Sequence, residues 1–150
     1  TELVRSFADI VSKNGNLLIG IGPDQFGRIP EEQLVPLRGL GSWMRTNGAA
    51  VVGTRPWVRA EATTTEGGAV RFTECDGAVN AILLEVSGPE FGIRGVDATD
   101  VSEVRLLGID DPVQWRVDAG QLRVRLPDRL PVAPAHVLRV ARGLRPAGSV

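Results

Sequence analysis

The stretch that decides the fold of this 150-residue chain is Asn14-Gly15-Asn16-Leu17-Leu18-Ile19-Gly20-Ile21-Gly22-Pro23. From Leu17 to Gly22 it contains no polar side chain, and a Gly-Pro pair follows. This pattern predicts a helix end, then a strand that is buried on both faces, then a loop. A strand that is apolar on both faces is typical of a parallel sheet covered by helices. We therefore expect residues 17–22 to belong to such a sheet.

Helices are expected on both sides of this strand. Residues 1–13 carry apolar side chains three and four positions apart, which makes one helical stripe, and Gly15 suits a left-handed helix end. The second helix should begin near Pro30, since proline suits the first helical position. Pro36 fits the interior of this helix poorly and predicts a kink or a later start. Residues 1–48 are thus predicted to form a helix-strand-helix unit.

The hydrophobic period changes after Asn47-Gly48. From residue 49 onward, apolar and polar residues alternate in short runs divided by turn dipeptides such as Asp76-Gly77 and Ala119-Gly120. This alternation is the signature of antiparallel strands in a sandwich. The predicted fold is therefore mainly β, with an antiparallel β-sandwich over residues 49–150 preceded by the helical unit.

Composition excludes several classes of function. The formal net charge is -1, which argues against nucleic-acid and anionic-membrane partners. Cys75 is the only cysteine, so the chain has no internal disulfide and no cysteine metal cluster. The longest apolar runs are far shorter than a membrane span, and no targeting segment is visible, which leaves the compartment open between bacterial cytoplasm and secretion. Because the first residue is Thr1, we expect the chain to be part of a longer protein.

The order and spacing of short motifs resemble the α-L-fucosidases, a family of retaining glycoside hydrolases. The first part resembles the last strand-helix unit of the family's catalytic (β/α) barrel, and the second resembles its C-terminal β-sandwich. The matching motifs are Ser12-Lys13-Asn14-Gly15-Asn16-Leu17-Leu18, Ile21-Gly22-Pro23, Gly27, Ile29-Pro30 and Asn47-Gly48, then Val79 to Leu84, Leu106-Leu107-Gly108-Ile109, Trp115 and Leu126 to Val140. The chain departs from the family pattern at Gly20, Phe26, Ala49 and Val52, which thins the polar network expected at the barrel end.

The resemblance implies hydrolysis of terminal α-L-fucose from glycoconjugates with retention, without a metal or an organic cofactor. It also implies that the aspartate nucleophile and the glutamate acid/base precede residue 1. The chain alone is then expected to be inactive, with no catalytic residue of its own. Its expected partners are the upstream catalytic barrel segment and, in the intact enzyme, a fucosylated glycan; a homo-oligomeric partner is left open.

One carboxylate is a candidate for contact with substrate. Asp24 follows the predicted strand at the C-terminal mouth of the barrel, where the active sites of such barrels lie. The other notable carboxylates suit structural roles, either in the first turn of a helix or in a turn before proline; these are Glu31, Glu32, Asp110 and Asp111.

The remaining candidates also favour structural roles. His136 is the only histidine and has no nucleophile in a recognisable motif, so surface or edge packing is expected. Trp115 alternates in step with Val113 and Val117, which favours a core position over a sugar platform. Trp57 is expected to seal the contact between the barrel unit and the sandwich.

Two alternative functions for the sandwich stay open at this stage. It could be a carbohydrate-binding module without enzymatic activity, although the sequence contains no tyrosine and few aromatic residues. It could also be a scaffold or oligomer interface.

Overall fold

The computed structural model of the chain describes residues 1–141 and 145–146. Two helices, α1 (Glu2–Ser12) and α2 (Glu31–Asn47), precede the strands, and a short 3-10 helix, η1 (Gly48–Ala50), follows α2. The strands are β1 (Arg55–Thr63), β2 (Ala69–Cys75), β3 (Ala78–Leu83), β4 (Glu90–Gly92), β5 (Val96–Asp97), β6 (Glu103–Leu106), β7 (Gln114–Asp118), β8 (Gln121–Arg125), β9 (His136–Ala141) and β10 (Arg145–Pro146). Neither α-helix of the described residues is long and apolar enough to cross a membrane.

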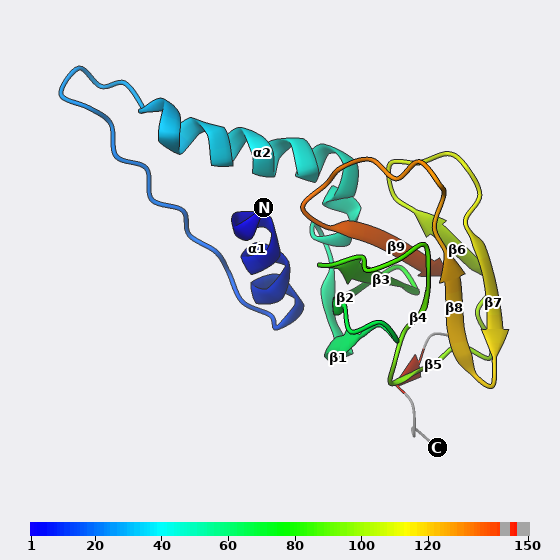
Figure 1. Cartoon of the computed structure of the whole chain (residues 1–150). Coiled ribbons are helices and arrows are strands. Elements are labelled where there is room, and N and C mark those ends of the chain that lie inside the picture. The colour runs from blue at the N-terminus through cyan, green and yellow to red at the C-terminus, as the bar shows by residue number, and fades with distance from the viewer. Residues whose placement is uncertain (142–144, 147–150) are drawn as a thin grey trace.

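The strands form antiparallel sheets that pack as a sandwich (Figure 1). One sheet has five strands in the order β1-β2-β3-β9-β6, and the other has three in the order β4-β8-β7; β5 and β10 form a separate pair. The dipeptides predicted to form hairpin turns do so, with positive φ at Asp76, Gly77, Ala119 and Gly120. The predicted fold class, a mainly β chain with a small helical part, is confirmed.

The core of the sandwich lies between the sheets. Phe72, Leu122 and Leu138 are fully buried there. Trp57 packs on Phe72, with ring centroids 4.9 Å apart. Trp57 therefore lies in the sandwich core. The position predicted from the sequence, at the contact between the helices and the sandwich, is wrong. The register of β1 shifts between Pro56 and Glu61, and such an irregularity changes which side chains of a strand face inward.

The two helices cover the outer face of the five-stranded sheet and build a second core. Trp43 on α2 is the largest side chain in it and is 4% exposed. Its Nε1 donates a hydrogen bond to the carbonyl oxygen of Ala135, 2.9 Å away, just before β9. On α1, Ala8 packs in the same core as Ile82 of β3. Strand β3 is therefore buried on both faces, which explains why its sequence is apolar at nearly every position.

The exception in β3 is Asn80, whose polar groups all have partners within reach. Its Nδ2 donates to the hydroxyl oxygen of Thr73 at 3.2 Å, and that hydroxyl donates to the carbonyl oxygen of Ala50 at 2.7 Å. Arg139 donates to its Oδ1 at 3.4 Å. This chain of hydrogen bonds satisfies a buried amide and ties η1 to the sheet.

Two details of the helical unit differ from the sequence-based predictions. Asn14, and not Gly15, adopts the left-handed conformation after α1. Position 15 needs glycine because its backbone passes close to Ile10: a Cβ there would lie 2.7 Å from the Cγ2 of Ile10. Helix α2 begins at Glu31, next to Pro30, and continues through Pro36 to Asn47, so the later start that Pro36 suggested is not seen. A proline inside a helix removes one backbone hydrogen bond and crowds the carbonyl four residues earlier, so Pro36 weakens the first turns of α2.

The predicted strand at residues 17–22 is not a strand in this chain. The segment between α1 and α2 runs out from the body and back as a long excursion (Figure 1). Residues 17–22 form no β-ladder with any described residue. The sequence pattern is that of a sheet strand, but the described residues contain no neighbouring parallel strand for it to pair with.

Candidate functional site: the exposed apolar segment

Residues 17–21 combine a core-like sequence with exposure to solvent. Leu18 is 95% exposed and Ile21 is 48% exposed, and Ile19 is also exposed. Near the tip of the same excursion, Phe26 is 72% exposed. Apolar side chains gathered in this way usually mark a contact surface. We call residues 17–21 the apolar segment.

The tip of the excursion is an ordered turn built around Asp24. The Oδ1 of Asp24 accepts hydrogen bonds from the backbone N–H groups of Phe26 and Arg28, at 2.8 and 2.9 Å. The backbone of Asp24 closes the same turn by bonding to Arg28 and Gly27, and Gly27 has φ of 77°. The guanidinium of Arg28 lies 5.7 Å from the centre of the Phe26 ring. Asp24 thus organises its own loop, a role that aspartate often takes in turns.

The apolar segment is anchored to α2 at its end. The side-chain amide of Gln33 accepts from the N–H of Gly22 at 2.8 Å and donates to the carbonyl oxygen of Gly22 at 3.1 Å. These two bonds satisfy both backbone groups of Gly22, as pairing with a neighbouring β-strand would. Sequence reasoning missed it, because Gln33 lies 11 residues away and its type carries no signal for such a contact.

We expect Asp24→Ala to loosen this turn and Asp24→Asn to preserve it, because the asparagine Oδ1 can accept the same two hydrogen bonds. The measurement is amide hydrogen exchange at Phe26 and Arg28. Exchange should speed up at both amides in the alanine variant only. Equal exchange in the two variants would contradict the assigned role of Oδ1.

Two further carboxylates of the helical unit, Asp9 and Glu31, are held in ion pairs. Asp9 on α1 pairs with Arg71 on β2 and with Lys13, and the hydrogen bond from Lys13, followed by that from Arg71, lowers the pKa of its carboxyl. Glu31 pairs with Arg38 at 2.5 Å. Among the described residues, no cluster of three or more His, Cys, Asp or Glu side chains could hold a metal ion. The distinctive feature of the helical unit is its apolar segment.

His136 lies in a cavity of about 280 Å³ between α2 and the sandwich. It pairs with Leu83 on a strand inside the five-stranded sheet, so the expected edge position is wrong, while its side chain stays partly exposed. Burial lowers the pKa of its imidazole below the ordinary 6.5. The segment before β9, from Pro131 to Pro134, lines the cavity together with Trp43 and Thr46. Protonation of this half-buried histidine therefore works against the contact between α2 and the sandwich.

We expect the stability of the chain to fall as the pH drops below about 6.5. Because the pKa of His136 is lower in the folded state than in the unfolded state, the unfolded state binds the proton more readily in this range. Urea unfolding at pH 7.5 and 5.5 measures the effect. His136→Gln should reduce the difference between the two pH values; an unchanged difference would contradict the assignment.

Trp115 lies in a second cleft, of about 500 Å³, between β6 and β7. Asp110 and Asp111 line the same cleft, in the turn before Pro112. Trp115 is half-buried and packs against the sandwich core, as predicted, although β7 is an edge strand and its neighbour Val117 is exposed. The ring therefore packs against the core from the three-stranded sheet, the open side of the sandwich, which lies opposite the helices.

Comparison with known proteins gives one consistent result. The sequence model of a family described as Alpha-L-fucosidase matches residues 1–49. The chain is 35% identical over 145 residues to an α-L-fucosidase of Branchiostoma floridae, covering 93% of this chain and 32% of that protein. It is 32% identical over 138 residues to the tissue α-L-fucosidase of Homo sapiens, covering 89% of this chain and 28% of that one.

Solved structures give the same result over 93–94% of this chain. An α-fucosidase of Thermotoga maritima, crystallised with a mechanism-based inhibitor, superposes with a TM-score of 0.84 at 31% identity and covers 94% of this chain and 34% of its own. An α-L-fucosidase isoenzyme of Paenibacillus thiaminolyticus superposes with a TM-score of 0.78 at 28% identity, covering 93% and 34%. The chain thus spans about a third of the length of the relatives it matches.

Proposed function

We propose, from the premise that this chain belongs to the α-L-fucosidase family, that it is the C-terminal portion of a retaining enzyme that removes terminal α-L-fucose from glycoconjugates. Its part in that enzyme is to complete and support the catalytic barrel. Residues 1–48 supply the last strand-helix unit of the barrel, and the sandwich over residues 49–150 buttresses it.

The exposure of the apolar segment is the observation that carries this proposal. Leu18, Ile19 and Ile21 are each worth about 1.5–3 kcal/mol when buried, or about 4.5–9 kcal/mol together. The sandwich has a complete core without them. The free backbone edges of the segment also need ladder partners. An upstream barrel would supply both requirements by pairing a strand on each side of residues 17–21.

The chemistry would come from the upstream barrel. Retaining hydrolysis needs two carboxylates about 5–5.5 Å apart, one acting as the nucleophile and the other first as acid and then as base. Asp9 and Glu31 are occupied in ion pairs, and Asp24 organises the loop tip through Oδ1. Within the completed barrel, Asp24 would lie at the C-terminal mouth of the strand and border the substrate pocket.

Reconstitution in trans tests the proposal. This chain, the upstream barrel segment encoded before it, and an equimolar mixture of the two are assayed for hydrolysis of an aryl α-L-fucoside. We expect turnover in the mixture only. Turnover by this chain alone would overturn the proposal. So would a failure of the folded segments to associate; in that case, binding of neutral glycans by this chain would support the alternative of a carbohydrate-binding module.

A further inference from the structure

A cleft with an excess of positive charge lies at the free edge of β1, away from the apolar segment. Its volume is about 490 Å³. Three arginines and one carboxylate line it, and small side chains on the neighbouring wall leave it open; the lining is Arg59, Glu61, Ala62, Thr63, Ala69, Arg71, Arg94 and Gly95. We call this the arginine cleft.

The charges on the side of the cleft next to α1 balance one another. Arg71 pairs with Asp9 and, at 3.6 Å, with Glu61. Lys13 pairs with Asp9 at 2.9 Å and with Glu61 at 3.3 Å. Two cations and two anions thus form one network, which fixes this wall without attracting a further anion.

The other two arginines have no such balance. Arg94 donates from Nε to the carbonyl oxygen of Thr64 at 3.3 Å and from Nη2 to that of Thr65 at 3.0 Å, so neutral groups hold it in place. Arg59 lies directly over Gly95, where a Cβ would be 2.7 Å from its Nη1. Among the described residues, no carboxylate forms an ion pair with either of them. The cleft therefore has one guanidinium group held by carbonyl oxygens, that of Arg94, a second that lies against Gly95, that of Arg59, and a net excess of two positive charges.

Such a pair of guanidinium groups selects for oxyanions. Planar N–H donors match the oxygens of a sulfate or a carboxylate, often with two parallel hydrogen bonds. The small side chains at Ala62, Ala69 and Gly95 leave room for a ring that carries the anion. Among the described residues, no aromatic side chain lines the cleft, which disfavours a single-stranded nucleic acid, because such strands bind by stacking their bases.

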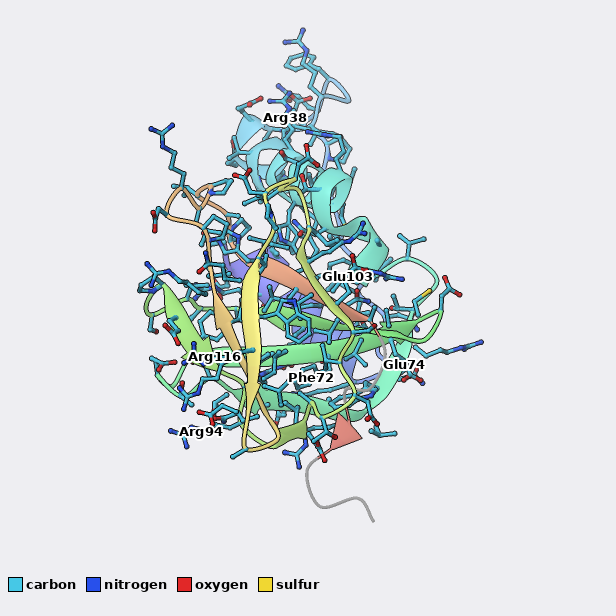
Figure 2. All side chains as sticks on the ribbon, turned by 90° about the vertical axis from the view of Figure 1, so that its right-hand side faces the viewer. Arg38, Phe72, Glu74, Arg94, Glu103 and Arg116 are labelled. Carbon is cyan, nitrogen blue, oxygen red and sulfur yellow. The ribbon has the colours of Figure 1, made fainter. Side chains whose placement is uncertain are left out.

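We propose that the arginine cleft binds the anionic group, a sulfate ester or a carboxylate, of a substituted carbohydrate. The choice of a carbohydrate rests on the proposed function, since glycans that carry fucose are the substrates of that enzyme. Arg59 and Arg94 contact the anion, and the network around Arg71 supports them. Figure 2 shows Arg94 at the lower left rim of the molecule, below Arg116.

Titration calorimetry of the whole chain tests this site with four probes. These are a sulfated dextran oligosaccharide, an oligogalacturonide, a neutral dextran oligosaccharide and a short DNA oligonucleotide. We expect the first probe, the second, or both to bind, which identifies sulfate or carboxylate as the preferred group. Affinity should fall as the salt concentration rises. Equal affinity for the neutral oligosaccharide or for DNA would overturn the proposal.

Substitutions locate the binding. Arg59→Gln and Arg94→Gln should each weaken binding about five- to tenfold, a loss between that of an exposed ion pair and a buried charged hydrogen bond. Arg105→Gln is the matched control, because Arg105 is an exposed arginine paired with Glu103 on β6. Unchanged affinity in both cleft variants, with unchanged melting temperatures, would overturn the proposal. This experiment measures binding by this chain and not hydrolysis. Its result therefore does not depend on whether the reconstitution succeeds.

Discussion

Trp43→Ala is expected to lower the free energy of unfolding by about 3–5 kcal/mol, because it empties the centre of the core between the helices and the sheet. The change also leaves the carbonyl oxygen of Ala135 without its donor. Urea unfolding followed by circular dichroism measures the loss. Trp43→Phe, which keeps most of the packing and removes only the hydrogen bond, should cost about 1–3 kcal/mol.

Trp115→Ala is a useful comparison for this experiment. Trp115 is half-buried on an edge strand, so its truncation should cost less than that of Trp43. A loss under about 1 kcal/mol for Trp43→Ala would contradict the close packing of α2 on the sheet. A larger loss for Trp115 than for Trp43 would show that the open side of the sandwich, and not the helical face, carries the stability.

The double variant Leu18→Asp/Ile21→Asp is expected to weaken association with the upstream barrel segment by about 100-fold or more. Removing two buried aliphatic side chains costs about 3–6 kcal/mol, and each 1.4 kcal/mol corresponds to about tenfold in affinity. Burying two carboxylates inside a barrel adds to this cost. The measurement is the dissociation constant of the two segments, with fucosidase turnover of the mixture as a second readout.

The same double variant should leave the isolated chain as stable as before, because both side chains are already exposed there. Val58→Asp is the matched control. Val58 is 76% exposed on β1, far from the apolar segment in sequence, and its substitution should change neither stability nor association. If the double variant associated normally, the apolar segment would not be the contact with the barrel.

The sandwich was largely predictable because its signals are local. In Asp76-Gly77 and Ala119-Gly120 the glycine readily adopts the positive φ that a two-residue hairpin turn needs, and this favours a hairpin wherever the dipeptide lies in the fold. Trp57 was misplaced because its orientation depends on a register shift in β1, and a register shift arises from the pairing with β2, not from the residues of β1 alone.

The candidate site was predictable in part. The pattern at residues 17–22 predicted a strand buried on both faces, whereas in this chain the segment is exposed and forms no ladder with any described residue. The roles of single residues were harder to predict from the sequence. The hydrogen bonds of Asp24 to its own loop fit its turn sequence, whereas the contacts of Gln33 with Gly22 and of Trp43 with Ala135 join residues 11 and 92 positions apart. Such contacts follow from the tertiary arrangement and leave no local sequence signal.

The central claim is that residues 17–21 are a barrel strand whose partners lie in the upstream segment. Amide hydrogen exchange at residues 17–21, measured on this chain alone and after addition of the upstream barrel segment, tests it most directly. The account predicts fast exchange in the isolated monomer and strong protection in the complex, while exchange in β3 and β9 stays slow in both. Slow exchange at residues 17–21 in the isolated monomer, or no added protection in an active complex, would contradict it.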